Sequence, residues 1–280
     1  MFPTGIWILL AVSLLLCSVG FKKFLWFITV GYGLSAAGIG AALLVMSMIK
    51  GQFSWIFLLQ CAVMVIYGIR LGGFLLFREI KNENNRKKFL PAGGDVKMPI
   101  PASVVLWIFF GFLYLAQSAG PVYRFLNGRA GEISLLSYIG TALLALGFLF
   151  EAIADRQKSA AKETDPDMPA MKGLYKLCRC PDYFGEILFW TGMILTGLPV
   201  FKGVGQWVFA VIGYICILAI MLNGAKRVET RQIRNYGSKP EYNTYADKTP
   251  LLFPLIPFYH MTSPEKIAAE DAAKKARKSK

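Results

Sequence analysis

The sequence predicts an all-α, polytopic membrane protein: a seven-transmembrane-helix bundle with cytosolic loops and a cytosolic tail. The chain has 280 residues, of which 55% are hydrophobic, and its mean hydropathy is +0.47. An ordinary soluble domain of this size carries less apolar surface. Seven charge-poor stretches also approach the roughly 20 residues that a helix needs to cross a bilayer. They are residues 5–21, 24–49, 53–77, 100–119, 133–153, 185–201 and 204–224.

The distribution of basic residues predicts the orientation of these spans, because positively charged loops resist translocation. If the N-terminus is outside, the cytosolic segments hold 26 of the 31 Lys and Arg residues, the outer segments hold 4, and Arg70 lies within the third span. We therefore expect a cytosolic C-terminus, in a bacterial inner membrane or the endoplasmic reticulum. Residues 1–262 would form the membrane domain and residues 263–280 a basic cytosolic tail.

The net charge of +14 therefore belongs to one face of the protein. It suits topogenesis and contact with anionic membrane lipids, and near residues 156–179 and 226–234 it would also suit an anionic cofactor. Nucleic acid is not expected as a partner, because the basic residues lie on short loops without a binding domain. The sequence is compatible with a monomer.

The five cysteines lie in or beside predicted cytosolic or intramembrane segments, which argues against a disulfide framework. Cys178 and Cys180 resemble half of a metal site. No second pair accompanies them, and the single histidine, His260, is distant in sequence. We therefore expect no metal centre.

Two carboxylate pairs flank a basic loop between the fifth and sixth spans. Glu151 and Asp155 are four residues apart, as are Asp182 and Glu186, so each pair projects from one face of a helix. Pro181 suits the first turn of the sixth helix, where Asp182 would meet the positive end of the dipole. These carboxylates could simply cap helices and pair with nearby basic residues, namely Arg156, Lys158 and Arg179.

The alternative interpretation is a polar cleft, because an ionisable residue one turn into a span, such as Glu186, is costly without a partner. Carboxylates accept hydrogen bonds from ribose hydroxyls or a carboxamide, whereas Lys and Arg bind phosphates. A nucleotide cofactor needs both kinds of group. We favour this interpretation for the four carboxylates together.

A second candidate constellation is Tyr67 and Arg70 in the third span, whose spacing places them on one helix face. Arg70 should face the bundle interior or reach the cytosolic boundary. Tyr67 could donate a proton or hydrogen bond to a substrate carbonyl. An interfacial tyrosine beside a positive-inside arginine explains the pair equally well.

A third constellation begins just beyond the last span with Arg227 and Arg231, and continues to Tyr242, Tyr245 and residues 254–257. A tail rich in Tyr and Pro buries little surface by itself. We therefore expect it to fold back on the cytosolic helix ends and close one side of the cleft.

These residues resemble the steroid 5-alpha-reductase-type membrane reductases, especially a bacterial branch described as a domain of unknown function. Residues 173–186, which read Gly-Leu-Tyr-Lys-Leu-Cys-Arg-Cys-Pro-Asp-Tyr-Phe-Gly-Glu, are similar to that branch's Gly-Leu-Trp-Arg-Tyr-Ser-Arg-His-Pro-Asn-Tyr-Phe-Gly-Glu. Residues 151–158 and the Tyr-x-x-Tyr tail with its later Ile-Pro also match. The family's usual His and Asn are here Cys180 and Asp182, so the hydrogen bonds around the cofactor must differ.

The resemblance implies a seven-helix bundle that holds NADPH and transfers hydride to the β carbon of a conjugated enone in a lipid or steroid-like substrate. It implies that Tyr67 faces the enone carbonyl, with Arg70 as the second catalytic candidate. The second span contains no acidic residue to match the glutamate that partners this tyrosine in mammalian-type enzymes. With the basic and aromatic neighbours included, the candidate NADPH-binding residues are Glu151, Asp155, Lys158, Lys162, Arg179, Asp182, Tyr183, Glu186, Arg227, Arg231 and Tyr245.

Two other functions stay open. Membrane methyltransferases of the isoprenylcysteine or phospholipid type share an Arg-His-Pro-x-Tyr-x-Gly segment and bind S-adenosylmethionine. Glu186 after Gly185, together with Glu151 and Asp155 upstream, fits the reductases better. The other alternative is an inactive, lipid-binding member, which the cysteine at position 180 favours.

Overall fold

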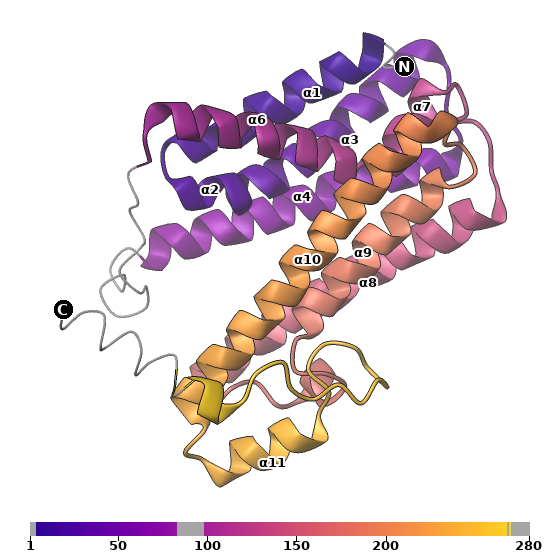
Figure 1. Ribbon diagram of the computed structural model, residues 1–280. Coiled ribbons are helices and arrows are strands. Elements are labelled where there is room, and N and C mark those ends of the chain that lie inside the picture. Colours follow the sequence, from indigo (N-terminus) through magenta and orange to yellow (C-terminus); the bar gives the residue numbers. More distant parts are fainter. Residues whose placement is uncertain (1–3, 83–97, 268, 270–280) are drawn as a thin grey trace. The chain divides into compact units, whose positions relative to one another are not determined.

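The computed structural model describes residues 4–82, 98–267 and 269 (Figure 1), and within them every regular element is helical. This confirms the all-α prediction for that part of the chain. Residues 83–97 of the predicted cytosolic loop and residues 268 and 270–280 of the predicted tail lie outside the described residues. The helices are α1 (Thr4–Cys17), η1 (Ser18–Phe21), α2 (Phe24–Ile28), α3 (Val30–Lys50), α4 (Trp55–Asn82), α6 (Ile100–Gln117), α7 (Ala119–Leu126), α8 (Leu135–Thr164), η3 (Gly173–Lys176), α9 (Pro181–Gly197), α10 (Gly203–Tyr236) and α11 (Pro240–Lys248).

Six helical segments in the described chain are long and apolar enough to cross a membrane: Thr4–Phe21, Phe24–Lys50, Trp55–Phe77, Ile100–Gln117, Leu135–Thr164 and Gly203–Tyr236. They coincide with six of the seven predicted spans and support a multi-pass membrane protein. The predicted span at residues 185–201 falls on α9, which has 17 residues. At 1.5 Å per residue this helix is about 25 Å long, shorter than the roughly 30 Å hydrocarbon core. The seventh crossing therefore stays a prediction.

Two of the helices extend well beyond the spans that the sequence predicts. The helix α8 continues from the apolar stretch to Thr164, and α10 continues to Tyr236. Residues 156–162 and 226–234 are largely Lys, Arg, Gln, Ala and Glu. These residue types have high helix propensity, so the helix can continue into water beyond the membrane. Two of the predicted cytosolic loops are therefore in part rigid helical extensions.

The chain divides into two compact units. The first unit comprises residues 1–145 and 190–216, and the second comprises residues 146–189 and 217–280. In the first unit, α1, α3, α4 and α6 lie alongside one another (Figure 1).

Glycines bring α3 and α4 of the first unit into backbone contact. A Cβ built on Gly33 would lie 2.6 Å from the amide nitrogen of Gly72, and one on Gly68 would lie 2.3 Å from the carbonyl oxygen of Gly33. Helices packed in lipid gain little from burying apolar surface against each other, so close approach through small residues is their main source of attraction.

The same device joins α8 and α9 in the second unit. A Cβ on Gly147 would lie 2.4 Å from the amide nitrogen of Phe189, and one on Gly185 would lie 2.7 Å from the amide nitrogen of Glu151. The two backbones therefore touch where the fifth predicted span ends and α9 begins. This contact places the 151–158 segment directly beside the first turns of α9.

Replacing Gly185 with Ala should destabilise the protein, because the new methyl group would meet backbone atoms of α8 that cannot rotate away. Overpacking of this kind costs about 1–3 kcal/mol. We expect the thermal unfolding midpoint in detergent to fall by several degrees. Gly73→Ala on α4 is the matched control, because nothing lies within 4 Å of its Cβ; equal midpoints for the two variants would contradict the close contact.

Candidate functional site

The second unit gathers the predicted acidic residues on the facing turns of α8 and α9. Glu151 is 3% exposed and Glu186 is 9% exposed, whereas Asp155 and Asp182 are half-buried. The Lys158 ammonium lies 2.8 Å from the Asp182 carboxylate. The structure thus places the 151–158 and 182–186 segments side by side, with two carboxylates buried and a third joined to a lysine.

Local sequence explains how α9 presents these groups. Pro181 is the first residue of α9 and Asp182 lies in its first turn, where a carboxylate meets the positive end of the helix dipole. The ring of Tyr183 lies over α10, since a Cβ on Gly224 would come within 2.7 Å of it. Gly224 therefore leaves room for a half-buried tyrosine beside the acidic cluster.

The loop between α8 and α9 is braced by Lys162. Its ammonium donates to the carbonyls of Pro166 and Met168, at 2.9 Å each, and to the Tyr236 hydroxyl at 2.5 Å. An ammonium has three hydrogens, so these acceptors use all of them. The structure gives Lys162, predicted as a cofactor contact, a role in holding the loop.

The 173–176 turn is held between α8 and α11. Gly173 has φ of +66° and the amide of Leu174 donates to the Gln157 side chain at 2.8 Å. The hydroxyl of Tyr245 donates to the Tyr175 carbonyl at 2.7 Å. Burial raises the pKa of Tyr175, and the charges of Asp182 and Asp155 raise it further. Tyr245 therefore secures the turn, whose tyrosine ring lies close to the acidic cluster.

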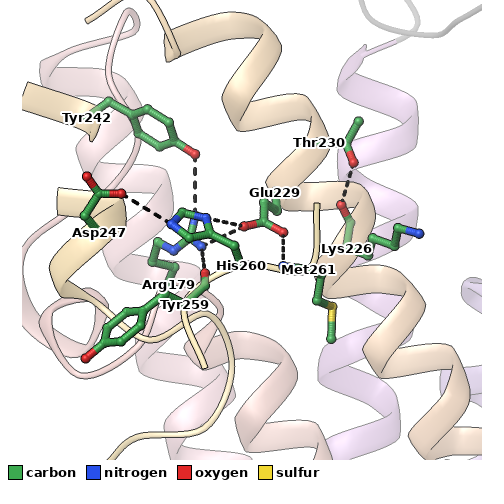
Figure 2. A network of polar contacts seen from close by, with 9 residues as sticks. All are labelled: Arg179, Lys226, Glu229, Thr230, Tyr242, Asp247, Tyr259, His260 and Met261. Atoms are coloured by element: carbon green, nitrogen blue, oxygen red, sulfur yellow. Dashed lines mark hydrogen bonds and ion pairs between the residues drawn. The ribbon is translucent and has the colours of Figure 1, made fainter. Parts of the chain in front are cut away.

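Arg179 is the centre of a buried polar network that joins the loop, α10 and the tail (Figure 2). Its guanidinium lies 2.8 Å from the Glu229 carboxylate, and both side chains have no exposed surface. The same guanidinium donates to the Tyr259 carbonyl and lies 3.5 Å from the Tyr242 hydroxyl. Arg179 was predicted as a cofactor contact, and the structure instead turns it toward Glu229.

The tail completes the coordination of Glu229. The amide of Met261 donates to one carboxylate oxygen at 2.9 Å, and the His260 ring lies 3.1 Å from the other. The second ring nitrogen of His260 lies 3.3 Å from Asp247 (Figure 2). Sequence reasoning missed both Glu229 and His260. A signal was present, because Glu229 is the only acidic residue in the otherwise basic stretch 225–236.

Cys178 and Cys180 are buried, neutral thiols. The amide of Cys180 donates to the Leu251 carbonyl at 2.9 Å. Burial raises the pKa of Cys178 to about 12 and also raises that of Cys180, so neither is an effective nucleophile at neutral pH. The residues that the structure describes contain no group of three or more His, Cys, Asp or Glu that could hold a metal ion.

Arg227 and Arg231 lie on the exposed face of α10, on either side of the inward-facing Glu229. Within the described residues, the structure gives neither guanidinium an ion-pair or hydrogen-bond partner. They are the predicted phosphate-binding groups that remain available to a ligand.

The predicted catalytic pair belongs to the first unit. Tyr67 is fully buried, and its hydroxyl lies 3.4 Å from that of Tyr32 on α3. The Trp190 indole donates to the Tyr32 hydroxyl and its ring packs edge-on against Tyr67 at 6.3 Å between centroids. Arg70 is half-buried one turn further along α4.

Tyr32 is a neighbour of Tyr67 that the sequence pattern does not reveal. The resemblance calls for an acidic residue in the second span, whereas the structure supplies a hydroxyl from that span. The only indication in the sequence is that Tyr32 stands between two glycines, Gly31 and Gly33. Glycines at such positions let neighbouring helices approach closely.

Comparison with known proteins places the chain in a family. Residues 20–249 match DUF1295, described as a protein of unknown function. The chain belongs to the DUF1295 family. This family is related to steroid 5-alpha-reductase-like proteins, and the matched range includes every catalytic and cofactor-binding candidate that the sequence predicts. No curated protein and no solved structure matches the chain significantly.

Glu229→Gln should strongly destabilise the second unit, because it leaves the buried Arg179 charge without a counter-charge. Breaking a buried ion pair from one side costs about 3–5 kcal/mol. We expect a much lower thermal unfolding midpoint in detergent. The exposed neighbour Arg231→Gln is the control and should unfold like the unmodified protein.

The double variant Arg179→Met with Glu229→Leu removes both charges and should recover part of the lost stability. A Glu229→Gln protein that unfolds at the original temperature would show that the ion pair does not hold the tail.

Proposed function

We propose that this chain is an NADPH-dependent membrane reductase that saturates a conjugated carbon–carbon double bond in a lipid or steroid-like enone. The observation that carries the proposal is the pair of buried carboxylates, Glu151 and Glu186, on facing turns of α8 and α9. Carboxylates at such a position can accept hydrogen bonds from a ligand. Family membership adds support, since DUF1295 is related to steroid 5-alpha-reductase-like proteins.

The residues of the second unit fit a nucleotide. Glu151, Glu186 and Asp155 supply acceptors for ribose hydroxyls and a carboxamide. For the phosphates, Arg227 and Arg231 are exposed and available. The other predicted cations are engaged within the protein, by Asp182, by the 166–168 carbonyls and by Glu229. The cofactor would therefore be held by acceptors from α8 and α9 and by guanidinium groups from α10.

The reaction adds a hydride to the β carbon of the enone and a proton to its α carbon, and NADPH supplies the hydride. Negative charge develops on the carbonyl oxygen as the β carbon is attacked, and a positioned donor lowers the barrier most at that atom. Tyr67 would donate this hydrogen bond. The Tyr67 hydroxyl lies 3.4 Å from the Tyr32 hydroxyl, which in turn accepts a hydrogen bond from the Trp190 indole. These contacts would fix the direction of the Tyr67 hydroxyl, and Arg70 would add positive charge nearby.

The proposal includes the topology that the sequence predicts: seven crossings, the N-terminus outside and the cytosolic face carrying the cofactor. The α9 helix is about 25 Å long and packs through backbone contact on α8. A helix that is shorter than the hydrocarbon core can still cross the bilayer, because the bilayer thins locally and the polar residues at the helix ends reach water. The substrate would be a membrane lipid, and a monomer would suffice.

A methyltransferase that uses S-adenosylmethionine is the alternative enzyme, supported by the shared segment at residues 179–185. Arg179 of this segment is in a buried ion pair with Glu229, a structural role that either enzyme could retain. The third hypothesis is that the chain is an inactive, lipid-binding protein, and the buried, unreactive thiol of Cys180 supports it.

Glu186→Gln should weaken NADPH binding, because an amide accepts hydrogen bonds without the assistance of charge. Hydrogen bonds to charged groups are worth about 1.5–3 kcal/mol, so affinity should fall roughly 10-fold to 100-fold. Titration of NADPH fluorescence with purified protein measures it. Glu132→Gln, at an exposed surface glutamate, is the control. Equal affinity for both variants would make Glu186 a structural residue.

Tyr67→Phe should lower turnover about 100-fold or more while sparing cofactor affinity, because only the hydrogen bond to the developing oxyanion is lost. Lipids that accumulate in cells lacking the protein identify the enone, and NADPH oxidation with that enone measures turnover. A fully active Tyr67→Phe protein would remove this tyrosine from the mechanism.

A further inference from the structure

The C-terminal segment of the second unit contains an exposed apolar loop, residues 253–258, which reads Phe-Pro-Leu-Ile-Pro-Phe. The side chain of Leu255 is 99% exposed, Ile256 53% and Phe258 40%. Leu255 also has φ of +70°, the one non-glycine residue with positive φ in the described chain. Backbone strain that holds an apolar side chain out into solvent calls for a functional explanation.

The base of the apolar loop is fixed, so its position is defined. The amide of Leu251 donates to the Phe258 carbonyl at 2.8 Å, which closes the loop. The amides of Arg179 and Cys180 donate to the Pro250 and Leu251 carbonyls at 2.8 and 2.9 Å. The loop is thereby attached to the residues that immediately precede α9.

A row of aromatic contacts connects the apolar loop to the end of the charge-free stretch of α8. The ring of Phe253 packs edge-on against Phe184 of α9 at 6.3 Å, and Phe184 packs edge-on against Phe150 of α8 at 5.8 Å. Phe150 is the last residue of the charge-free stretch of α8, directly before Glu151. Phe253 is therefore two ring contacts away from the point where the charge-free stretch of α8 ends.

Leu255 is two residues further along the loop, and two extended residues span at most about 7 Å. The headgroup region is roughly 5–7 Å deep on each side of the hydrocarbon core. A loop directed toward the bilayer would therefore bring Leu255 among the headgroups.

The backbone of the apolar loop also suits a water-poor environment. Pro254 and Pro257 have no N–H group, and the amides of Ile256 and Phe258 donate to the Phe253 and Ile256 carbonyls at 3.3 and 2.7 Å. Four of these six residues therefore leave no N–H group to be desolvated. The N–H groups of Phe253 and Leu255 would meet water or headgroup oxygens in the interfacial zone, which is less demanding than the hydrocarbon core.

The surroundings of the apolar loop carry the charge that a lipid surface attracts. Lys172 and Lys176 are exposed shortly before Arg179 and Cys180, the residues that pair with the loop base, and Lys248 is exposed at the end of α11, five residues before the loop. Lysines beside an apolar tip are the arrangement by which proteins bind anionic headgroups. We propose that residues 253–258 are an interfacial anchor that inserts Leu255 and Ile256 among the headgroups and upper acyl chains of the bilayer that holds the protein.

Spin labels test this in vesicles of equal parts phosphatidylcholine and phosphatidylglycerol. The parent is Cys216→Ser, which removes the one half-buried cysteine and leaves four buried ones. Leu255→Cys and, separately, Ile256→Cys carry the label, and Asn243→Cys on the exposed side of α11 is the matched control. Equal elution profiles and unfolding temperatures establish that all variants are folded.

We expect the labels at 255 and 256 to collide more often with oxygen than with a water-soluble nickel chelate, and the label at 243 to do the reverse. Nickel accessibility at 255 and 256 equal to that at 243 would overturn the proposal. Spin–spin broadening at 255 that disappears on dilution with unlabelled protein would also overturn it, because the loop would then contact a second copy of the chain. Neither result bears on NADPH binding.

Discussion

Everything proposed for the second unit depends on the backbone contact between α8 and α9. With no side chain at Gly147 or Gly185, the two helices approach until a Cβ on Gly185 would lie 2.7 Å from the Glu151 amide. That approach buries the carboxylates of Glu151 and Glu186 on facing turns and brings the Lys158 ammonium within 2.8 Å of the Asp182 carboxylate. Carboxylates accept hydrogen bonds, and a nucleotide's hydroxyls and carboxamide are suitable donors.

The ion pair of Arg179 with Glu229 has a structural role, because it joins three distant parts of the chain. The loop before α9 contributes the guanidinium, α10 the carboxylate, and the tail a carbonyl and an amide. Such a pair adds little net stability, but its geometry is demanding and it is costly to break. The consequence is that the tail returns to one fixed position, which carries Tyr245 to the 173–176 turn and Phe253 to Phe184.

Hydropathy and charge spacing predicted the helical class, six of the membrane segments and the segments that meet at α8 and α9. They could not assign the cations, because a side chain's role depends on acceptors that spacing does not reveal. Lys162 is held by the carbonyls of residues 166 and 168, and Arg179 by a glutamate 50 residues away. Tyr32 was missed for the same reason: it meets Tyr67 only because glycines let α3 and α4 touch. The cofactor role of the acidic residues stays a prediction.

The most direct test of the central claim is ligand-dependent thermal stability of the purified protein, measured in parallel with NADPH, NADH and S-adenosylmethionine. Any ligand that binds only the folded state raises the unfolding temperature, and the gain in stability grows with the logarithm of its concentration over its dissociation constant. The proposed function predicts stabilisation by NADPH and none by S-adenosylmethionine. Stabilisation by S-adenosylmethionine alone would contradict it.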